Sequence, residues 1–179
     1  MLRTSRRQLL LALPLLPAIL LHPAAADPET PQKPETAAKP WPGVEFTEAR
    51  AFAWPAESEP KRLVQQDKSL LPGMANKDGA PLSSEQLKRL SAAVTGTHPE
   101  YGLMRCYTPR HAIVFYDKDK KVVAFLELCL DCRGERSEPE VPAKFLDLPA
   151  IVEIFAELKL PMGNYADAEA FKKSLKAGK

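Results

Sequence analysis

The 179-residue sequence lacks the motifs of the common enzyme classes. It contains no G-x-S-x-G nucleophile elbow, no G-x-x-x-x-G-K-[ST] or G-x-G-x-x-G phosphate loop, no H-E-x-x-H helix and no C-x-x-C-H haem attachment site. Histidine is scarce, with three residues in the whole chain, one of which is His22 near the N-terminus. Acid–base catalysis would have to use carboxylates, and the sequence singles none out. We therefore assign no catalytic residue.

A strong charge of either sign is also absent. The formal net charge is +2, and the first 26 residues contribute Arg3, Arg6 and Arg7 without any acidic residue, so the remaining chain carries a net charge of −1. This balance gives no electrostatic reason to bind nucleic acid or an anionic membrane. The predicted partner is an unidentified protein or a metal ion.

Residues 1–26 have the three parts of a cleavable export signal: a basic start, an apolar run over 9–21 and the small residues of 24–26. The run is shorter than the roughly 20 residues of a membrane span and contains two prolines. We predict cleavage before Asp27, no stable membrane insertion afterwards, and a periplasmic or secreted protein. Residues 5–10 (SRRQLL) resemble a twin-arginine signal, and an ordinary secretory leader is the alternative.

Residues 27–43 combine five prolines with charged and small residues, which predicts a disordered, proline-rich tether. The remaining residues, 44–179, have the length of one domain. Ser83 and Gln86 form a capping-box pattern, Leu82 supplies a hydrophobic staple, and Gly96 ends the helix predicted over 83–95.

Residues 111–117 and 121–129 are rich in β-branched and aromatic residues. This composition predicts a hairpin with a polar loop between its strands. Strand pieces are expected at 44–46 and 52–54. A helix beginning at Asp147 must end by Pro161, and a weaker helix ends at Gly178. The sequence therefore predicts an α+β domain, in which an antiparallel hairpin or sheet is packed by two or three amphipathic helices.

All three cysteines flank this hairpin, and antiparallel pairing brings Cys106 beside Cys132 at its base. With His111 at the start of the first strand and Cys129 at the end of the second, the set has the number and type of ligands of a closed zinc site. A cuprous ion is the second metal candidate, because thiolates favour soft metals. A register shift of one residue would turn His111 to the other face of the sheet.

Two other interpretations of the cysteines stay open. In an oxidising compartment, Cys106 can pair with Cys129 or Cys132 in a structural disulfide, and the chain would then be an interaction module. Alternatively, Cys129 and Cys132 form a redox pair, with Cys106 as the resolving thiol. Gly134 and the prolines that follow it disfavour the helix on which thioredoxin-like pairs lie.

Other polar residues near the cluster have simpler explanations. Four arginines bracket the hairpin and can receive an anion, although a salt-bridged surface is the more common role of such residues: Arg105, Arg110, Arg133 and Arg136. Glu127 is expected to face solvent on an alternating strand, and a buried carboxylate with a partner is the alternative. His98 is expected at the surface.

The motif Cys106-Tyr-Thr-Pro-Arg-His111, followed by a strand and Cys129-Leu-Asp-Cys132, resembles a group of secreted bacterial proteins that have no assigned activity. The resemblance covers about residues 44–162. It implies bacterial export and the unity of the cluster, and it implies no substrate. The function expected from the sequence is an exported, non-catalytic binding or accessory protein, with Cys106, His111, Cys129 and Cys132 holding zinc or copper.

Overall fold

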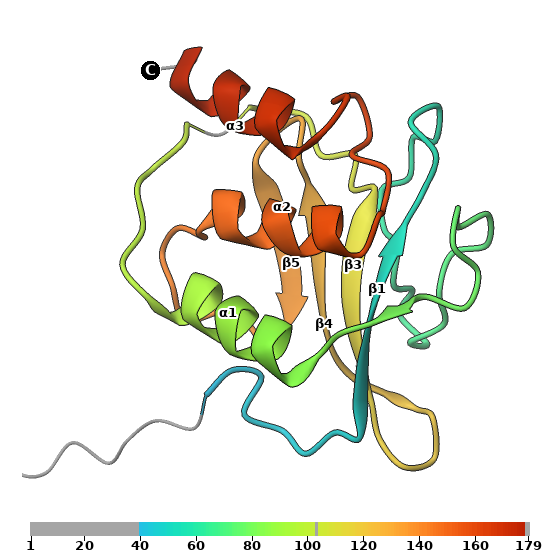
Figure 1. The fold of residues 1–179 in the computed structure, drawn as a ribbon. Coiled ribbons are helices and arrows are strands. Elements are labelled where there is room, and N and C mark those ends of the chain that lie inside the picture. The colour runs from blue at the N-terminus through green and yellow to red at the C-terminus, as the bar shows by residue number, and fades with distance from the viewer. Residues whose placement is uncertain (1–39, 103, 178–179) are drawn as a thin grey trace, which may run out of the picture. The chain divides into compact units, whose positions relative to one another are not determined.

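The computed structural model describes residues 40–102 and 104–177 (Figure 1). The predicted leader and most of the predicted tether lie outside the described residues. Eight elements follow one another along the chain: β1 (Glu48–Ala53), β2 (Ala80–Pro81), α1 (Ser84–Thr95), β3 (His111–Tyr116), β4 (Val122–Cys129), β5 (Gly134–Glu138), α2 (Leu148–Glu157) and α3 (Ala168–Ala177).

The strands form one antiparallel sheet in the order β2-β1-β3-β4-β5. The β3–β4 hairpin lies at its centre, with His111 opposite Leu128 and Tyr116 opposite Val122. The predicted hairpin is therefore confirmed. The predicted α+β class is confirmed as well, since the sheet is accompanied by three helices.

The outer strands were harder to predict than the hairpin. β5 has the sequence GERSE, which contains no apolar residue, so hydrophobic periodicity gives no sign of it. Pairing of Gly134 with Cys129 begins this strand. Of the two strand pieces expected at 44–46 and 52–54, only the second overlaps a strand. β1 spans Glu48–Ala53 and pairs with β3 along its whole length, and residues 44–46 precede it without forming a strand.

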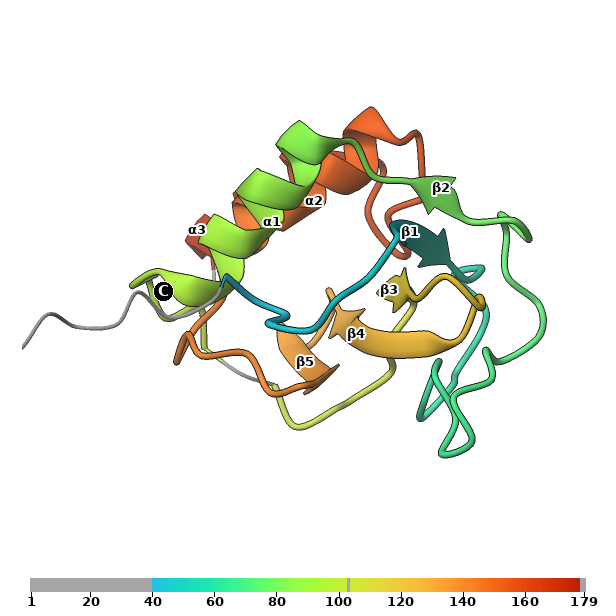
Figure 2. The ribbon, with the colours of Figure 1, turned by 90° about the horizontal axis from the view of Figure 1, so that it is seen from below.

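The three helices cover one face of the sheet, as the view in Figure 2 shows. The capping box predicted for α1 is present, with hydrogen bonds from Gln86 N to Ser83 Oγ (3.2 Å) and from Ser83 N to Gln86 Oε1 (2.9 Å). Asp147 caps α2 through the amide of Ala150. The side chains facing these helices come from alternate positions of the central strands, among them Ile113, Phe115, Leu126 and Leu128.

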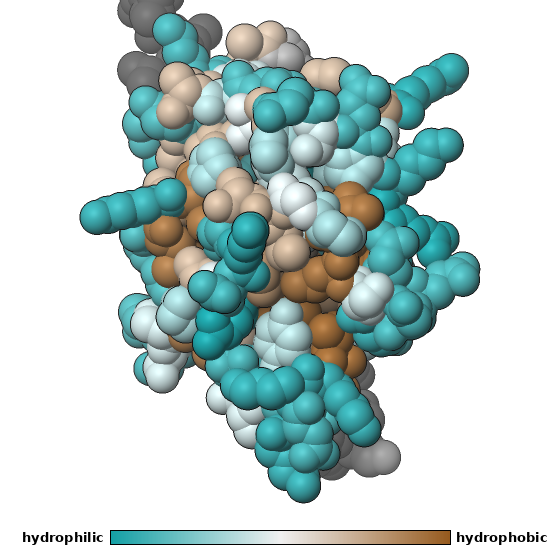
Figure 3. Space-filling view, turned by 90° about the vertical axis from the view of Figure 1, so that its right-hand side faces the viewer, coloured by the Kyte–Doolittle hydropathy of each residue, from teal (hydrophilic) through white to brown (hydrophobic). Residues whose placement is uncertain are grey.

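The opposite face is covered by the long connection between β1 and β2. Leu63 and Val64 of this connection are completely buried and pack with Val114 and Phe125 of the hairpin. Both faces of β4 are therefore buried, so its sequence does not alternate between apolar and polar residues. Figure 3 looks onto the side of the molecule that carries this connection, where hydrophobic surface is divided by hydrophilic side chains.

The folded domain begins earlier than Val44, where the sequence placed its start. Trp41, which was expected in the tether, is only 7% exposed and packs edge-on against Phe115. Its indole N–H donates to the carbonyl of Pro139 at 3.1 Å. An indole ring is a large apolar group with one donor, and here both parts find partners in the domain.

The α1 cap offers a matched pair of substitutions. Ser83→Ala removes the acceptor for the Gln86 amide, and we expect it to lower the free energy of unfolding by about 1 kcal/mol. Ser84 is exposed in the first turn, so Ser84→Ala is the control and should change stability much less. Urea unfolding followed by circular dichroism measures both. Equal losses would contradict the capping role.

Candidate functional site

The turn between β4 and β5 contains the Cys129–Cys132 pair, which forms a disulfide. The two residues have Cα atoms 5.5 Å apart, and each is only 1% exposed. The structural-disulfide alternative had paired Cys106 with one of these two cysteines, whereas the redox alternative had paired Cys129 with Cys132. The structure has the second pairing, because the turn itself brings Cys129 and Cys132 together, and the pairing with Cys106 is wrong for this structure.

Residues 104–108, which precede β3, lie along this turn. The amide of Met104 donates to the carbonyl of Cys132 at 3.2 Å, and the amide of Thr108 donates to Sγ of Cys129 at 3.4 Å. Cys106 lies between these two anchored residues, and it is exposed and unbonded. The backbone around residue 106 therefore lies next to the Cys129–Cys132 turn, as the sequence predicted.

The sulfur of Cys129 accepts a second backbone hydrogen bond. The amide of Cys132 lies 3.3 Å from it, in addition to the amide of Thr108. Amide donors aimed at a sulfur stabilise negative charge on it. If the disulfide opens, a thiolate on Cys129 has two donors already in place.

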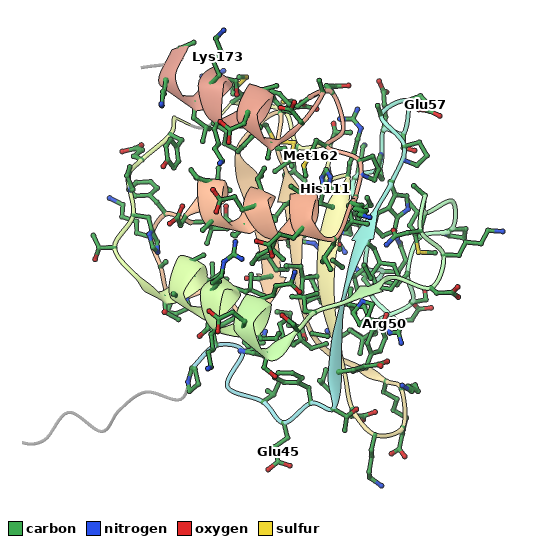
Figure 4. All side chains as sticks on the ribbon, viewed as in Figure 1. Glu45, Arg50, Glu57, His111, Met162 and Lys173 are labelled. Carbon is green, nitrogen blue, oxygen red and sulfur yellow. A yellow bond between two sulfur atoms is a disulfide. The ribbon has the colours of Figure 1, made fainter. Side chains whose placement is uncertain are left out.

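His111 lies on the other face of the sheet from Cys129. Its ring is fully buried, stacks on Phe155 of α2 with centroids 5.0 Å apart, and bonds through Nε2 to the carbonyl of Pro161 at 2.7 Å (Figure 4). It pairs with Leu128, whose side chain points opposite to that of the next residue, Cys129. The register therefore separates the histidine from the disulfide.

The four expected metal ligands do not converge in the structure, because His111 faces the helices, Cys129 and Cys132 are bonded to each other, and Cys106 is exposed. Within the part of the chain that the structure describes, no group of three or more His, Cys, Asp or Glu side chains is placed to hold a metal ion. Zinc or copper binding stays a prediction that metal analysis must test.

Burial governs the protonation of His111. Removal of the ring from water lowers its pKa from 6.5 to about 4, and the hydrogen bond to Pro161 only partly opposes this effect. Nδ1 has no hydrogen-bond partner. The ring is therefore neutral in the folded protein, with its proton on Nε2, where it can donate to the carbonyl of Pro161.

Glu127 is completely buried, and the expectation that it faces solvent is wrong. Its carboxylate accepts from the amides of Leu63 (2.9 Å) and Val64 (2.5 Å) and from two nitrogens of Arg136 (3.0 and 2.5 Å). The hydroxyl of Tyr107 donates to it at 3.4 Å. The covering connection, β4, β5 and the 104–108 segment thus meet at one carboxylate, a contact between distant segments that no local pattern reveals.

The arginines near the cluster are mostly occupied by internal partners. Arg110 bonds to Asp131 (2.6 Å) and to the carbonyl of Ser58 (2.9 Å). Arg133 donates to the carbonyls of Tyr101 and Ser174, and Arg136 pairs with Glu127. Arg105 is exposed. Arg110 and Arg136 are therefore better explained as members of internal salt bridges than as parts of a shared anion site.

His98 is also less solvated than expected. Its side chain is 14% exposed, and Nε2 lies 3.1 Å from the carbonyl of Ala92 near the end of α1. The same carbonyl also accepts from the amide of Gly96 at 3.1 Å, so the imidazole packs against the C-terminal end of the helix. The histidine has a local structural role.

An apolar groove of about 360 Å³ lies between residues 40–46 and α1. Leu87, Leu90 and Phe115 are among its lining residues. Sequence analysis missed the groove because it assigned residues 40–43 to the tether, and the groove exists only where that segment packs back on the domain.

Comparison with protein-family models, with curated proteins and with solved structures gave no match. Within residues 40–102 and 104–177, no helix is both long and apolar enough to cross a bilayer. The inference of function therefore depends on the geometry of the disulfide and its surroundings.

The depressed pKa of His111 predicts acid sensitivity. In the unfolded chain the imidazole takes up a proton below its ordinary pKa of 6.5, whereas in the folded protein it stays neutral until about pH 4. The unfolded state then binds more protons, so the free energy of unfolding falls as the pH drops through this window, by roughly 3 kcal/mol. Urea unfolding at several pH values should show a shallower dependence for His111→Gln. Identical slopes would contradict the assignment.

The carboxylate of Glu127 predicts a large effect of a small change. Glu127→Gln keeps the shape but removes the charge that Arg136 and the two amides require, and we expect a loss of about 3 kcal/mol in unfolding free energy. Glu140→Gln, at an exposed position, is the matched control. Chemical denaturation compares them, and a loss no larger than that of the control would show that the cluster is not needed.

Proposed function

We propose that this chain is an exported, non-catalytic binding or accessory protein in which the Cys129–Cys132 disulfide is a structural clamp. One observation carries the proposal: both cysteines are bonded and each is only 1% exposed. Reactive redox cysteines lie in partly exposed, electropositive surroundings. A shielded pair fits a structural role better.

The clamp holds the turn on which other segments depend. β5 starts at Gly134, directly beyond the turn, and residues 104–108 bond to both ends of it. Loop-closure entropy for so short a ring corresponds to about 2 kcal/mol of stabilisation. The disulfide therefore fixes the geometry of a joint between three segments.

Export is supported by the chemistry of the pair and by the predicted leader. Disulfides persist in the periplasm and outside the cell, where thiols are not kept reduced. Residues 1–26 have the pattern of a cleavable signal. The proposed location is the periplasm or the exterior of a bacterial cell, and the proposed partner is a protein.

Two buried ionisable groups of the central hairpin support a non-catalytic role. Glu127 receives four short hydrogen bonds, and His111 is bonded to a carbonyl on the far face of the sheet. A catalytic acid or base must reach a proton of its substrate. The carboxylate of Glu127 is occupied by its donors, and both side chains are completely buried, so neither is placed to reach a substrate.

Mass spectrometry of the mature protein, purified from the periplasm without chelator or reductant and treated with N-ethylmaleimide, tests the proposal. We expect a mass lighter by two hydrogens for the disulfide, a single maleimide on Cys106, cleavage before Asp27, and no bound metal. Peptide mapping should join Cys129 to Cys132. Stoichiometric zinc or copper with three reduced sulfurs would overturn the proposal in favour of the metal site.

A variant pair distinguishes a clamp from a catalytic disulfide. Cys129→Ser combined with Cys132→Ser should lower the unfolding free energy by about 2 kcal/mol, whereas Cys106→Ser, at an exposed position, should leave it unchanged. Catalytic reduction of insulin by the wild-type chain in the presence of dithiothreitol would instead identify a thiol–disulfide enzyme.

A further inference from the structure

The apolar groove between residues 40–46 and α1 shares no lining residue with the surroundings of the disulfide. Figure 1 shows residues 40–47 passing beneath α1, and the groove of about 360 Å³ lies between them. Trp41 and Phe46 line it together with Phe115, and both rings pack edge-on against Phe115, with centroids 5.3 and 4.9 Å away. Leu87 and Leu90 line it on the side of α1. The fold thus forms an aromatic and aliphatic groove at the surface.

This groove offers few hydrogen-bond partners. The indole N–H of Trp41 already donates to the carbonyl of Pro139 at 3.1 Å, so the ring presents only carbon to the groove. Apart from this indole, Ser91 is the one uncharged polar side chain among the described residues that line it. Figure 4 shows the side chain of Glu45 directed away from the domain. An occupant rich in polar groups, such as a peptide, would lose hydrogen bonds to water here without replacing them.

The volume of the groove limits the size of its occupant. An apolar cavity of about 150 Å³ holds a benzene ring, which has six carbon atoms. A groove of about 360 Å³ therefore accommodates roughly twice that number, close to one straight chain of twelve carbons. The two chains of a membrane phospholipid exceed this volume.

A single cation lies among the described residues that line the groove. It belongs to Lys88, whose side chain is 79% exposed and whose ion-pair partner, Glu85, lies 4.0 Å away. An exposed pair at this distance contributes little to stability, so the ammonium of Lys88 is available to another anion. The site therefore combines an apolar groove for one chain with a positive charge at its mouth.

We propose that the groove binds the chain of a free fatty acid, whose carboxylate lies beside the ammonium of Lys88. Such a ligand has one anionic group and brings no other polar atom into the groove. Binding also covers Val44, which lines the groove and is 41% exposed, and removal of apolar surface from water drives the association. The proposal goes beyond the structural role of the disulfide and uses none of its residues, so the two can fail separately.

Titration of the mature chain with decanoate and with decanol, which have the same chain length, tests the site. Of the two tryptophans, Trp41 lines the groove and Trp54 belongs to the other hydrophobic cluster, so a saturable change in tryptophan emission reports binding beside Trp41. We expect both ligands to bind the wild-type chain with one-to-one stoichiometry, and decanoate to bind more tightly. Absence of saturable binding would overturn the proposal.

A substitution that fills the groove tests its position. Ser91→Phe places a ring among the lining residues, and we expect the affinity for both ligands to fall by about tenfold or more. Ser84→Phe, at an exposed position on the same helix outside the groove, is the matched control and should bind as the wild type does. Equal affinities in the two variants would contradict the assignment of the groove.

Removal of the lysine charge separates recognition of the carboxylate from recognition of the chain. Lys88→Gln should weaken decanoate binding about threefold, because one exposed ion pair is lost, and should leave decanol binding unchanged. Lys77→Gln, at an exposed position in the β1–β2 connection, is the control and should alter neither. No effect on decanoate, or the same effect on both ligands, would overturn the proposed placement of the carboxylate.

Sedimentation of the mature chain, with and without vesicles of phosphatidylglycerol, tests the other occupants of an apolar groove. We expect a monomer that does not associate with the vesicles. A dimer that Ser91→Phe abolishes would place a second copy of the chain in the groove. Vesicle binding that the same variant abolishes would place a membrane surface there, and either result would overturn the proposal.

Discussion

The buried carboxylate of Glu127 is the constraint on which the second face of the sheet depends. A desolvated negative charge is tolerated only when donors surround it, and here they come from the β1–β2 connection and from Arg136 of β5. The same contacts fix Leu63 and Val64 as a cover over the hairpin. An irregular connection thereby covers the face that a second layer of helices covers in α/β folds.

This cover also decides the chemistry of the cysteines. Cys129 follows Glu127 by two residues and so faces the covered side, where residues 104–108 and the turn shield its bond to Cys132. His111, paired with Leu128, faces α2 instead. The imidazole and the disulfide lie on opposite faces of the sheet, and this separation favours a disulfide over a four-ligand metal site.

The functional interpretation follows from the contrast between a shielded bond and an exposed thiol. A buried disulfide stabilises its turn and resists external reductants, while a free thiol on the surface is open to reaction. The hydrogen bonds of Met104 and Thr108 hold the segment that contains the free thiol next to the turn that contains the disulfide.

Local physics specifies the elements that were predicted correctly: the capped helix at Ser83, the central hairpin, the helix beginning at Asp147 and the proximity of residue 106 to Cys129 and Cys132. These depend on periodicity, caps and turn length. The folded structure was needed to choose between the alternatives for Glu127, which is buried, and for the cysteines, of which Cys129 pairs with Cys132, and it alone places Trp41 in the core. β5 and the burial of Glu127 could not be predicted because they depend on contacts between segments far apart in the chain. Local patterns of hydrophobicity do not report such contacts.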